Sequence, residues 1–109
     1  MAEEKKLIGK LSEAEIKALK EKHGDIFAIK VDDAEGNTHY GYLRTPKRRD
    51  LSAASVAGSK DPLKFNETIM RQCWIGGDEE IRTDDYLFLA ASGVIADIIE
   101  VGEAQLEKL

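Results

Sequence analysis

Residues 26–44 decide the fold: Ile26-Phe27-Ala28-Ile29-Lys30-Val31-Asp32, a short polar turn, and then Thr38-His39-Tyr40-Gly41-Tyr42-Leu43-Arg44. The first half is rich in β-branched and aromatic residues, and its apolar side chains at alternate positions lie on one face. Between the halves, Gly36-Asn37 can take the positive φ that a tight turn requires. The stretch therefore predicts a β-hairpin with strands over 26–32 and about 38–44.

A helix is expected before the hairpin. Ser12 and Glu15 form a capping box, in which the serine side chain accepts from the Glu15 amide and the Glu15 side chain reaches back to the Ser12 amide. Gly24 stands where a left-handed residue ends a helix, so the pattern predicts a helix over about 13–23. Because two strands alone are marginal in water, the hairpin must pack on helices or pair with another chain.

Two helices are expected directly after the hairpin. Thr45-Pro46 and Asp61-Pro62 each combine an N-cap residue with a proline at the first helical position. They predict helices over about 46–57 and 62–74. The first is rich in alanine, and the second carries apolar residues at three- and four-residue spacings. Gly76-Gly77 is expected to stop the second helix.

A last and longer helix is predicted after Thr83, where acidic residues in the first turn suit the helix dipole. Gly93 interrupts this helix at a cost of about 1 kcal/mol relative to alanine, and Gly102 can end it. Its apolar face recurs at helical spacing and comprises Leu87, Ala91, Val94 and Ile98.

These elements follow the order α-β-β-α-α-α and predict an α+β fold, a two-stranded antiparallel hairpin packed on a bundle of about four helices. A length of 109 residues points to a single domain spanning 1–109 that needs no metal or disulfide to build its core. We expect residues 1–11 to be flexible and residues 103–109 to fray.

Charge and composition exclude several classes of protein. The formal net charge is −5, which argues against a general nucleic-acid or anionic-membrane binder, because phosphate contacts need a basic footprint. No apolar run approaches the roughly 20 residues that a bilayer crossing needs. The charged N-terminal stretch resembles no export signal, and a single cysteine excludes an internal disulfide framework. We therefore expect a cytoplasmic protein without membrane association.

Signals of catalysis are poor, so the sequence predicts no enzyme, no cofactor and no metal. His23 and His39 have no serine, cysteine or carboxylate at a recognised motif spacing. Cys73 lies on the apolar face of its helix, where burial as a small hydrophobic side chain is the default. One acidic cluster could attract a cation, but its spacing matches no metal motif; it comprises Asp78, Glu79, Glu80, Asp84 and Asp85.

Charge is unevenly distributed along the chain. Residues 44–64 carry six basic and two acidic side chains, whereas residues 75–109 carry nine acidic and two basic ones. These regions can pair within the fold, between copies or with a partner. The two helices flanking Gly58-Ser59-Lys60 also resemble a helix-turn-helix superficially, so one alternative is a small nucleic-acid-binding or regulatory module that uses the basic 44–64 segment.

Three stretches together resemble small proteins of tailed bacteriophages and prophages, those of the tail assembly chaperone type. The stretches are Tyr42-Leu43-Arg44-Thr45-Pro46 leading into Leu51-Ser52-Ala53-Ala54, Asp61-Pro62-Leu63-Lys64-Phe65-Asn66-Glu67 running to Cys73-Trp74-Ile75-Gly76-Gly77-Asp78, and Asp84-Asp85-Tyr86-Leu87-Phe88-Leu89-Ala90. The resemblance covers about residues 12–100. Its motifs are structural, a hairpin entering a helix bundle, and assign no family functional residue to a position here.

The resemblance implies a non-enzymatic assembly factor. Such chaperones bind the long, helical tape-measure protein in the host bacterial cytoplasm before the tail tube polymerises around it. If many copies cover a long client, each copy needs an apolar groove and must tolerate self-association. The resemblance therefore also implies a homo-oligomer. A minor virion structural protein is a further alternative. We expect the client to contact aromatic and basic side chains where the second strand exits, namely Tyr40, Tyr42, Arg44, Lys47, Arg48 and Trp74.

Overall fold

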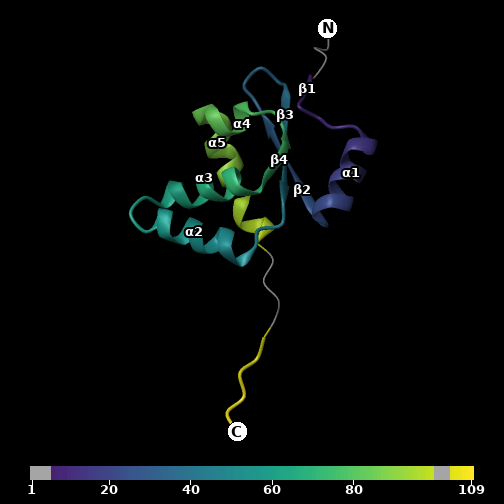
Figure 1. Cartoon of the computed structure of the whole chain (residues 1–109). Helices are drawn as coiled ribbons and strands as arrows, with labels where there is room; N and C mark the ends of the chain where they lie inside the picture. The colour runs from purple at the N-terminus through teal and green to yellow at the C-terminus, as the bar shows by residue number, and fades with distance from the viewer. Residues whose placement is uncertain (1–5, 100–103) are drawn as a thin grey trace.

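The computed structural model describes residues 6–99 and 104–109 of the chain and shows a mixed α+β fold. The elements in chain order (Figure 1) are β1 (Leu7–Ile8), α1 (Glu13–His23), β2 (Ile26–Asp32), β3 (Thr38–Arg44), α2 (Arg48–Gly58), α3 (Pro62–Cys73), β4 (Trp74–Gly77), α4 (Glu80–Thr83), α5 (Asp85–Ser92) and the 3-10 helix η1 (Ile95–Ile98).

Strand β3 is the centre of the sheet. On one side it pairs antiparallel with β2 over the whole length of both strands, from Ile26 opposite Arg44 to Asp32 opposite Thr38. The predicted hairpin is therefore confirmed, with the expected bounds. The other side of β3 pairs with two short strands, β1 in parallel and β4 antiparallel.

The prediction of a two-stranded sheet was wrong, since the described residues form a sheet of four strands. Leu7–Ile8, expected to be flexible, pairs with β3, while residues 1–5 of that stretch lie outside the described residues. Gly76-Gly77 does not simply stop a helix but belongs to β4. Both added strands are short and are stabilised by hydrogen bonds to β3, which local sequence patterns do not register.

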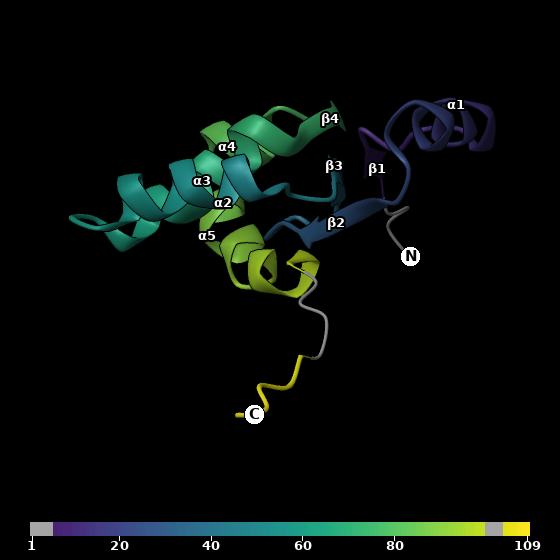
Figure 2. The ribbon, with the colours of Figure 1, turned by 60° about the horizontal axis from the view of Figure 1, so that its bottom comes forward.

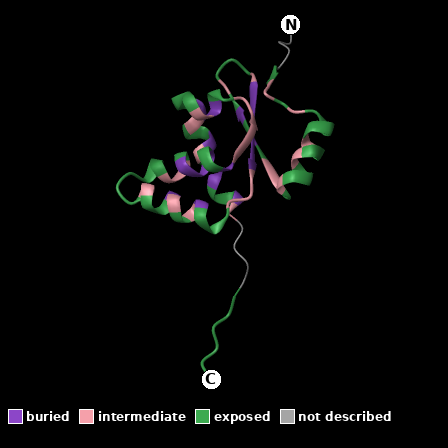
Figure 3. Cartoon of the chain, in the orientation of Figure 1, coloured by how far each residue is buried: buried purple, intermediate pink, exposed green. Residues whose placement is uncertain are grey.

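The sheet separates two unequal layers of helices. Helices α2 to α5 lie on one side of it and α1 lies on the other (Figures 1 and 2). The prediction that α1 joins a four-helix bundle was therefore wrong. Buried residues gather along β3 and on the helix surfaces that face it (Figure 3). The buried core is apolar and comprises Ile29, Val31, Leu43, Ala54, Ile69, Met70, Cys73, Ile81, Leu87, Ala91, Ile95 and Ile98.

The first three helices begin and end close to the predicted residues. Helix α1 has the expected bounds, and both hydrogen bonds of its capping box are present. Helix α3 begins at Pro62 behind the cap of Asp61. Helix α2 begins two residues later than predicted, because Lys47 rather than Thr45 precedes its first turn, and the Lys47 amide donates to the Asp50 carboxylate at 2.8 Å.

The predicted long helix after Thr83 is divided into two short elements, α5 and η1, and the short helix α4 before it was not predicted. The Asp84 side chain accepts from the Leu87 amide and starts α5 afresh, separating it from α4. Gly93 caps the other end of α5, and the chain continues as η1. Residues 104–109 form neither helix nor strand, and residue 103 lies outside the described residues. Among the residues described, no helix is long and apolar enough to span a bilayer.

Two glycines test how closely β4 approaches β3. Gly77 has a φ of +106°, and a Cβ there would collide with the Tyr40 carbonyl oxygen and lie 2.9 Å from the Gly41 Cα. Gly36, in the hairpin turn, has a φ of +86° but open space around it. We expect Gly36→Ala to lower the free energy of unfolding by about 1–2 kcal/mol, from backbone strain alone.

Gly77→Ala adds a backbone clash to the same strain, so we expect it to cost more than about 3 kcal/mol. Urea denaturation of both variants measures the difference. Equal losses for the two variants would contradict the close approach of β4 to β3.

Candidate functional site

The two tyrosines of the predicted client surface lie inside the protein. Tyr40 and Tyr42 are both buried, and their rings stack with centroids 6.3 Å apart. The segment joining β1 to α1 contacts them, because the Leu11 amide donates to the Tyr42 hydroxyl at 3.1 Å and the Lys10 ammonium lies 5.9 Å from the Tyr40 ring centroid. A central strand is covered on both faces, so these rings are not exposed for a client.

Arg44 is a structural link between β3 and two helices. Its guanidinium donates to both carboxylate oxygens of Asp50, at 2.7 and 3.2 Å, and to the Gln72 carbonyl at 3.0 Å. The Asp50 residue is 1% exposed. The hydrogen bond from Arg44 is the main cause that holds the pKa of Asp50 below its ordinary value, against the effect of burial. Arg44 thus compensates a buried charge.

Of the remaining predicted client residues, Trp74 lies on β4, whereas Lys47 and Arg48 lie together at the start of α2. The Trp74 side chain is half-buried, packs over Gly41 and faces the Arg82 guanidinium 4.7 Å from its ring centroid. Lys47 and Arg48 are exposed at the start of α2. The six residues predicted to contact a client therefore do not form one exposed surface.

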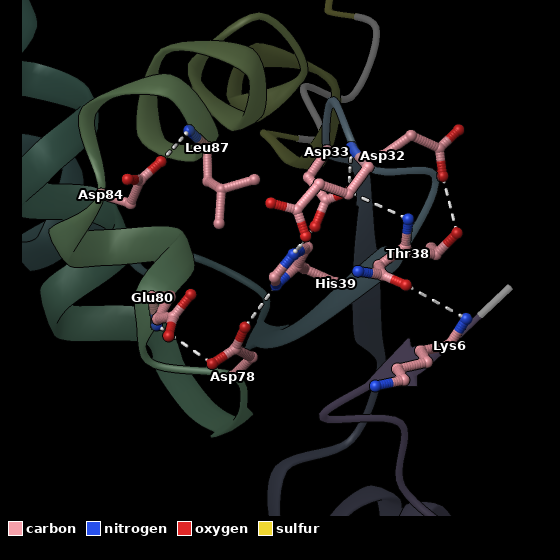
Figure 4. A network of polar contacts seen from close by, with 11 residues as sticks. Lys6, Asp32, Asp33, Thr38, His39, Asp78, Glu80, Asp84 and Leu87 are labelled. Atoms are coloured by element: carbon pink, nitrogen blue, oxygen red, sulfur yellow. Dashed lines mark hydrogen bonds and ion pairs between the residues drawn. The ribbon is translucent and has the colours of Figure 1, made fainter.

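His39, for which the sequence predicted no catalytic or ligand role, forms a buried polar site. It lies on the β3 face that packs against α4 and α5, opposite Val31, and is 3% exposed. Its Nδ1 is 2.5 Å from the Asp78 carboxylate, and its Nε2 is 2.8 Å from the Asp33 carboxylate (Figure 4). The partners are 39 and 6 residues away in the chain, so only the fold brings the three together.

The pKa values of the site follow from the position of His39 between two carboxylates. Burial alone lowers the pKa of His39, but the hydrogen bonds to Asp78 and then to Asp33 together outweigh it, and the pKa lies above its ordinary value. The hydrogen bond with His39, helped by the backbone amides of Asn37 and Glu35, lowers the pKa of Asp33 to about 2. The site thus favours a positive centre between negative groups.

A cavity of about 290 Å³ opens beside His39. Its lining is strongly acidic and includes Asp33, Glu35, Glu80 and Asp84 together with Ile8, Asn37, His39, Tyr86 and Leu87. One ligand atom each from His39, Asp78 and Glu80 lie within 4.8 Å of one another. The acidic residues after Gly77 were noticed in the sequence, but their proximity to His39 depends on the β3–β4 pairing.

A second feature on the same side of the molecule is the outer face of α5. Tyr86 is 61% and Leu89 is 54% exposed, and Ala90 is also exposed. Positions 86, 89 and 90 fall on one face of a helix. Asp84 and Asp85 are exposed at the N-terminal end of this face.

Comparison with solved structures finds a similar fold in an uncharacterised protein from Bacillus stearothermophilus. The TM-score is 0.53, and the match covers 84% of this chain and 99% of that chain. The sequences are 19% identical, so the likeness shows the fold alone. No protein-family model matches the chain. No curated protein matches it either.

The ion pair of Arg44 and Asp50 yields a stability prediction. Asp50→Asn removes the carboxylate and leaves a largely buried guanidinium without its counter-charge, so we expect the free energy of unfolding to fall by about 3 kcal/mol. Asp97→Asn, at an exposed position, is the matched control and should change it by less than about 0.5 kcal/mol. Urea denaturation at pH 7 measures both, and indistinguishable midpoints would contradict the role given to Asp50.

The same pair gives a pH dependence. Because the pKa of Asp50 is lower in the folded protein than its ordinary value of 3.8, its contribution to stability is fully present above pH 3.8 and is lost as the pH falls through the folded-state pKa. Between pH 5 and pH 2.5 we therefore expect the urea midpoint of Asp50→Asn to fall less than that of the unmodified chain. If the urea midpoints of the two proteins fell in parallel between pH 5 and pH 2.5, the pKa of Asp50 would not be lowered in the folded protein.

Proposed function

We propose that this protein is a non-enzymatic, protein-binding assembly factor of the tail assembly chaperone kind, whose client is a helical segment of a long tape-measure-like protein. The resemblance of three stretches of the chain to such chaperones supports this proposal. The observation that carries it is the outer face of α5, which leaves large apolar side chains exposed on a helix whose inner side is already packed in the core.

Helix α5 is apolar nearly all round. Leu87 and Ala91 are buried against the core, Phe88 packs partly against it, and Tyr86 and Leu89 point the other way and are more than half exposed. A helix that is hydrophobic on all sides is normally buried on all sides. Exposed apolar patches that are rimmed by polar residues mark interaction sites, so we place the client on this face.

The surroundings of the face define the chemistry of the client. Glu80, Asp84 and Asp85 are exposed at its N-terminal end, and like charges there would repel an acidic partner. The matching occupant is an amphipathic helix with apolar residues at three- and four-residue spacing and with lysine or arginine beside them. The proposed client face is therefore the outer side of α5 and not the strand exit that the sequence suggested.

The test is a pull-down of the tagged chain from its native host, read by mass spectrometry. We expect one very long, helix-rich protein, whose recovery falls at least about tenfold with Tyr86→Asp combined with Leu89→Asp, because two buried apolar contacts are lost. Val56→Asp is the matched control, since Val56 is 73% exposed on α2, and it should leave recovery unchanged. Circular dichroism checks that all variants remain folded.

Three outcomes would overturn the proposal. If neither the α5 double variant nor Val56→Asp lowered recovery of the client, the client would not bind to α5. A mass that increases with concentration, and that the α5 variant abolishes, would show that a second copy covers the face. Retention of DNA or RNA at about 50 mM salt, where phosphate contacts are strong, would favour a nucleic-acid-binding module that uses the exposed Lys47 and Arg48.

A further inference from the structure

We propose that His39, Asp78 and Glu80 bind a divalent transition-metal ion, for which Zn²⁺ is the representative probe. One imidazole nitrogen and two carboxylates are a donor set that such ions accept, and three protein ligands with an open position are typical of zinc sites that keep a water. This site goes beyond the proposed protein-binding function and does not depend on it.

The donor atoms are already close to the spacing that coordination requires. Ligands at about 2.1 Å from a tetrahedral ion lie roughly 3.3 Å from one another, and the three donor atoms here lie within 4.8 Å of one another. His39 Nδ1 and the Asp78 carboxylate form a hydrogen bond at 2.5 Å, so an ion would replace the proton between them and these two donor atoms would move apart to the ligand spacing. The backbones of His39 and Asp78 are held in place, because His39 lies on the central strand and the Asp78 amide donates to the Tyr40 carbonyl at 2.8 Å. Glu80 is exposed, so a rotation of its side chain can close the set.

The second hydrogen bond of His39 is an independent argument. Histidines that bind metals usually hold their other ring nitrogen on a carboxylate or carbonyl, which fixes the ring and makes the ligand nitrogen more basic. Here Asp33 takes Nε2 at 2.8 Å, while Nδ1 faces Asp78. Asp33 in turn accepts from the amides of Glu35 and Asn37, both at 2.9 Å, so this supporting carboxylate is itself held in place.

The cavity beside His39 supplies charge and access. Its lining, among the residues described, holds four carboxylates and no lysine or arginine. A single histidine cannot balance these carboxylates, whereas a divalent ion held by His39 and Glu80 adds two positive charges beside them. The volume of about 290 Å³ leaves room for water ligands and a path by which the ion enters.

The test is a titration of the purified full-length chain, first stripped with a chelator, with Co²⁺ followed by visible absorption and with Zn²⁺ as competitor. We expect saturation at one ion per chain and displacement of Co²⁺ by Zn²⁺. Glu80→Gln should weaken the affinity at least about tenfold, and its exposed side chain can be replaced without harm to folding. His39→Gln should abolish the absorption bands, with circular dichroism checking that it folds.

Glu35→Gln is the matched control, because it removes one negative charge from the same cavity but no ligand. We expect it to change the affinity less than about twofold, as screened charges do. Absence of binding would overturn the proposal. Equal losses of affinity for Glu35→Gln and Glu80→Gln, or equal competition by Mg²⁺, would also overturn it, because they would show only diffuse attraction of cations to an acidic surface. The assay contains no client, so its failure would not bear on the protein-binding function.

Discussion

The pairing of β4 with β3 is the constraint on which the rest of the structure depends. Gly77 can lie against the Tyr40 carbonyl only because it lacks a Cβ, and Gly41 leaves the space that the Trp74 ring fills. Because of this close approach, the Asp78 amide can donate a hydrogen bond to the Tyr40 carbonyl. The carboxylate of Asp78 is thereby placed on His39, and α4 and α5 follow directly on the same side of the sheet.

Much of the fold could be predicted because its signals are local. The capping box of Ser12, the alternating residues of β2 and the cap at Asp61 act within a few positions, and the corresponding elements have the expected bounds. The strands β1 and β4 could not be predicted in this way, since each is short and depends on a partner strand. Gly76-Gly77 illustrates the ambiguity, because the same pair that ends a helix also permits a close strand contact.

The candidate site was less predictable, because burial and distant contacts decide it. Tyr40 and Tyr42 have the composition of a binding surface, but β3 is central and both of its faces are covered, so the rings are buried. Arg44 similarly compensates the buried charge of Asp50. His39 shows the opposite error. It lacks a local motif, and its importance appears only when the hairpin turn brings Asp33 to one nitrogen and β4 brings Asp78 to the other.

The proposed ion site and the proposed client face share structural elements. Glu80 is the first residue of α4, and Tyr86, which is exposed on α5, also lines the cavity beside His39. An ion held by His39 and Glu80 would tie α4 to the central strand. Since the apolar face starts only a few residues later, the same ion would restrict the orientation of α5. Ordering a surface before its partner arrives reduces the entropy lost on binding, which gives a physical reason for a metal ion beside the proposed client face.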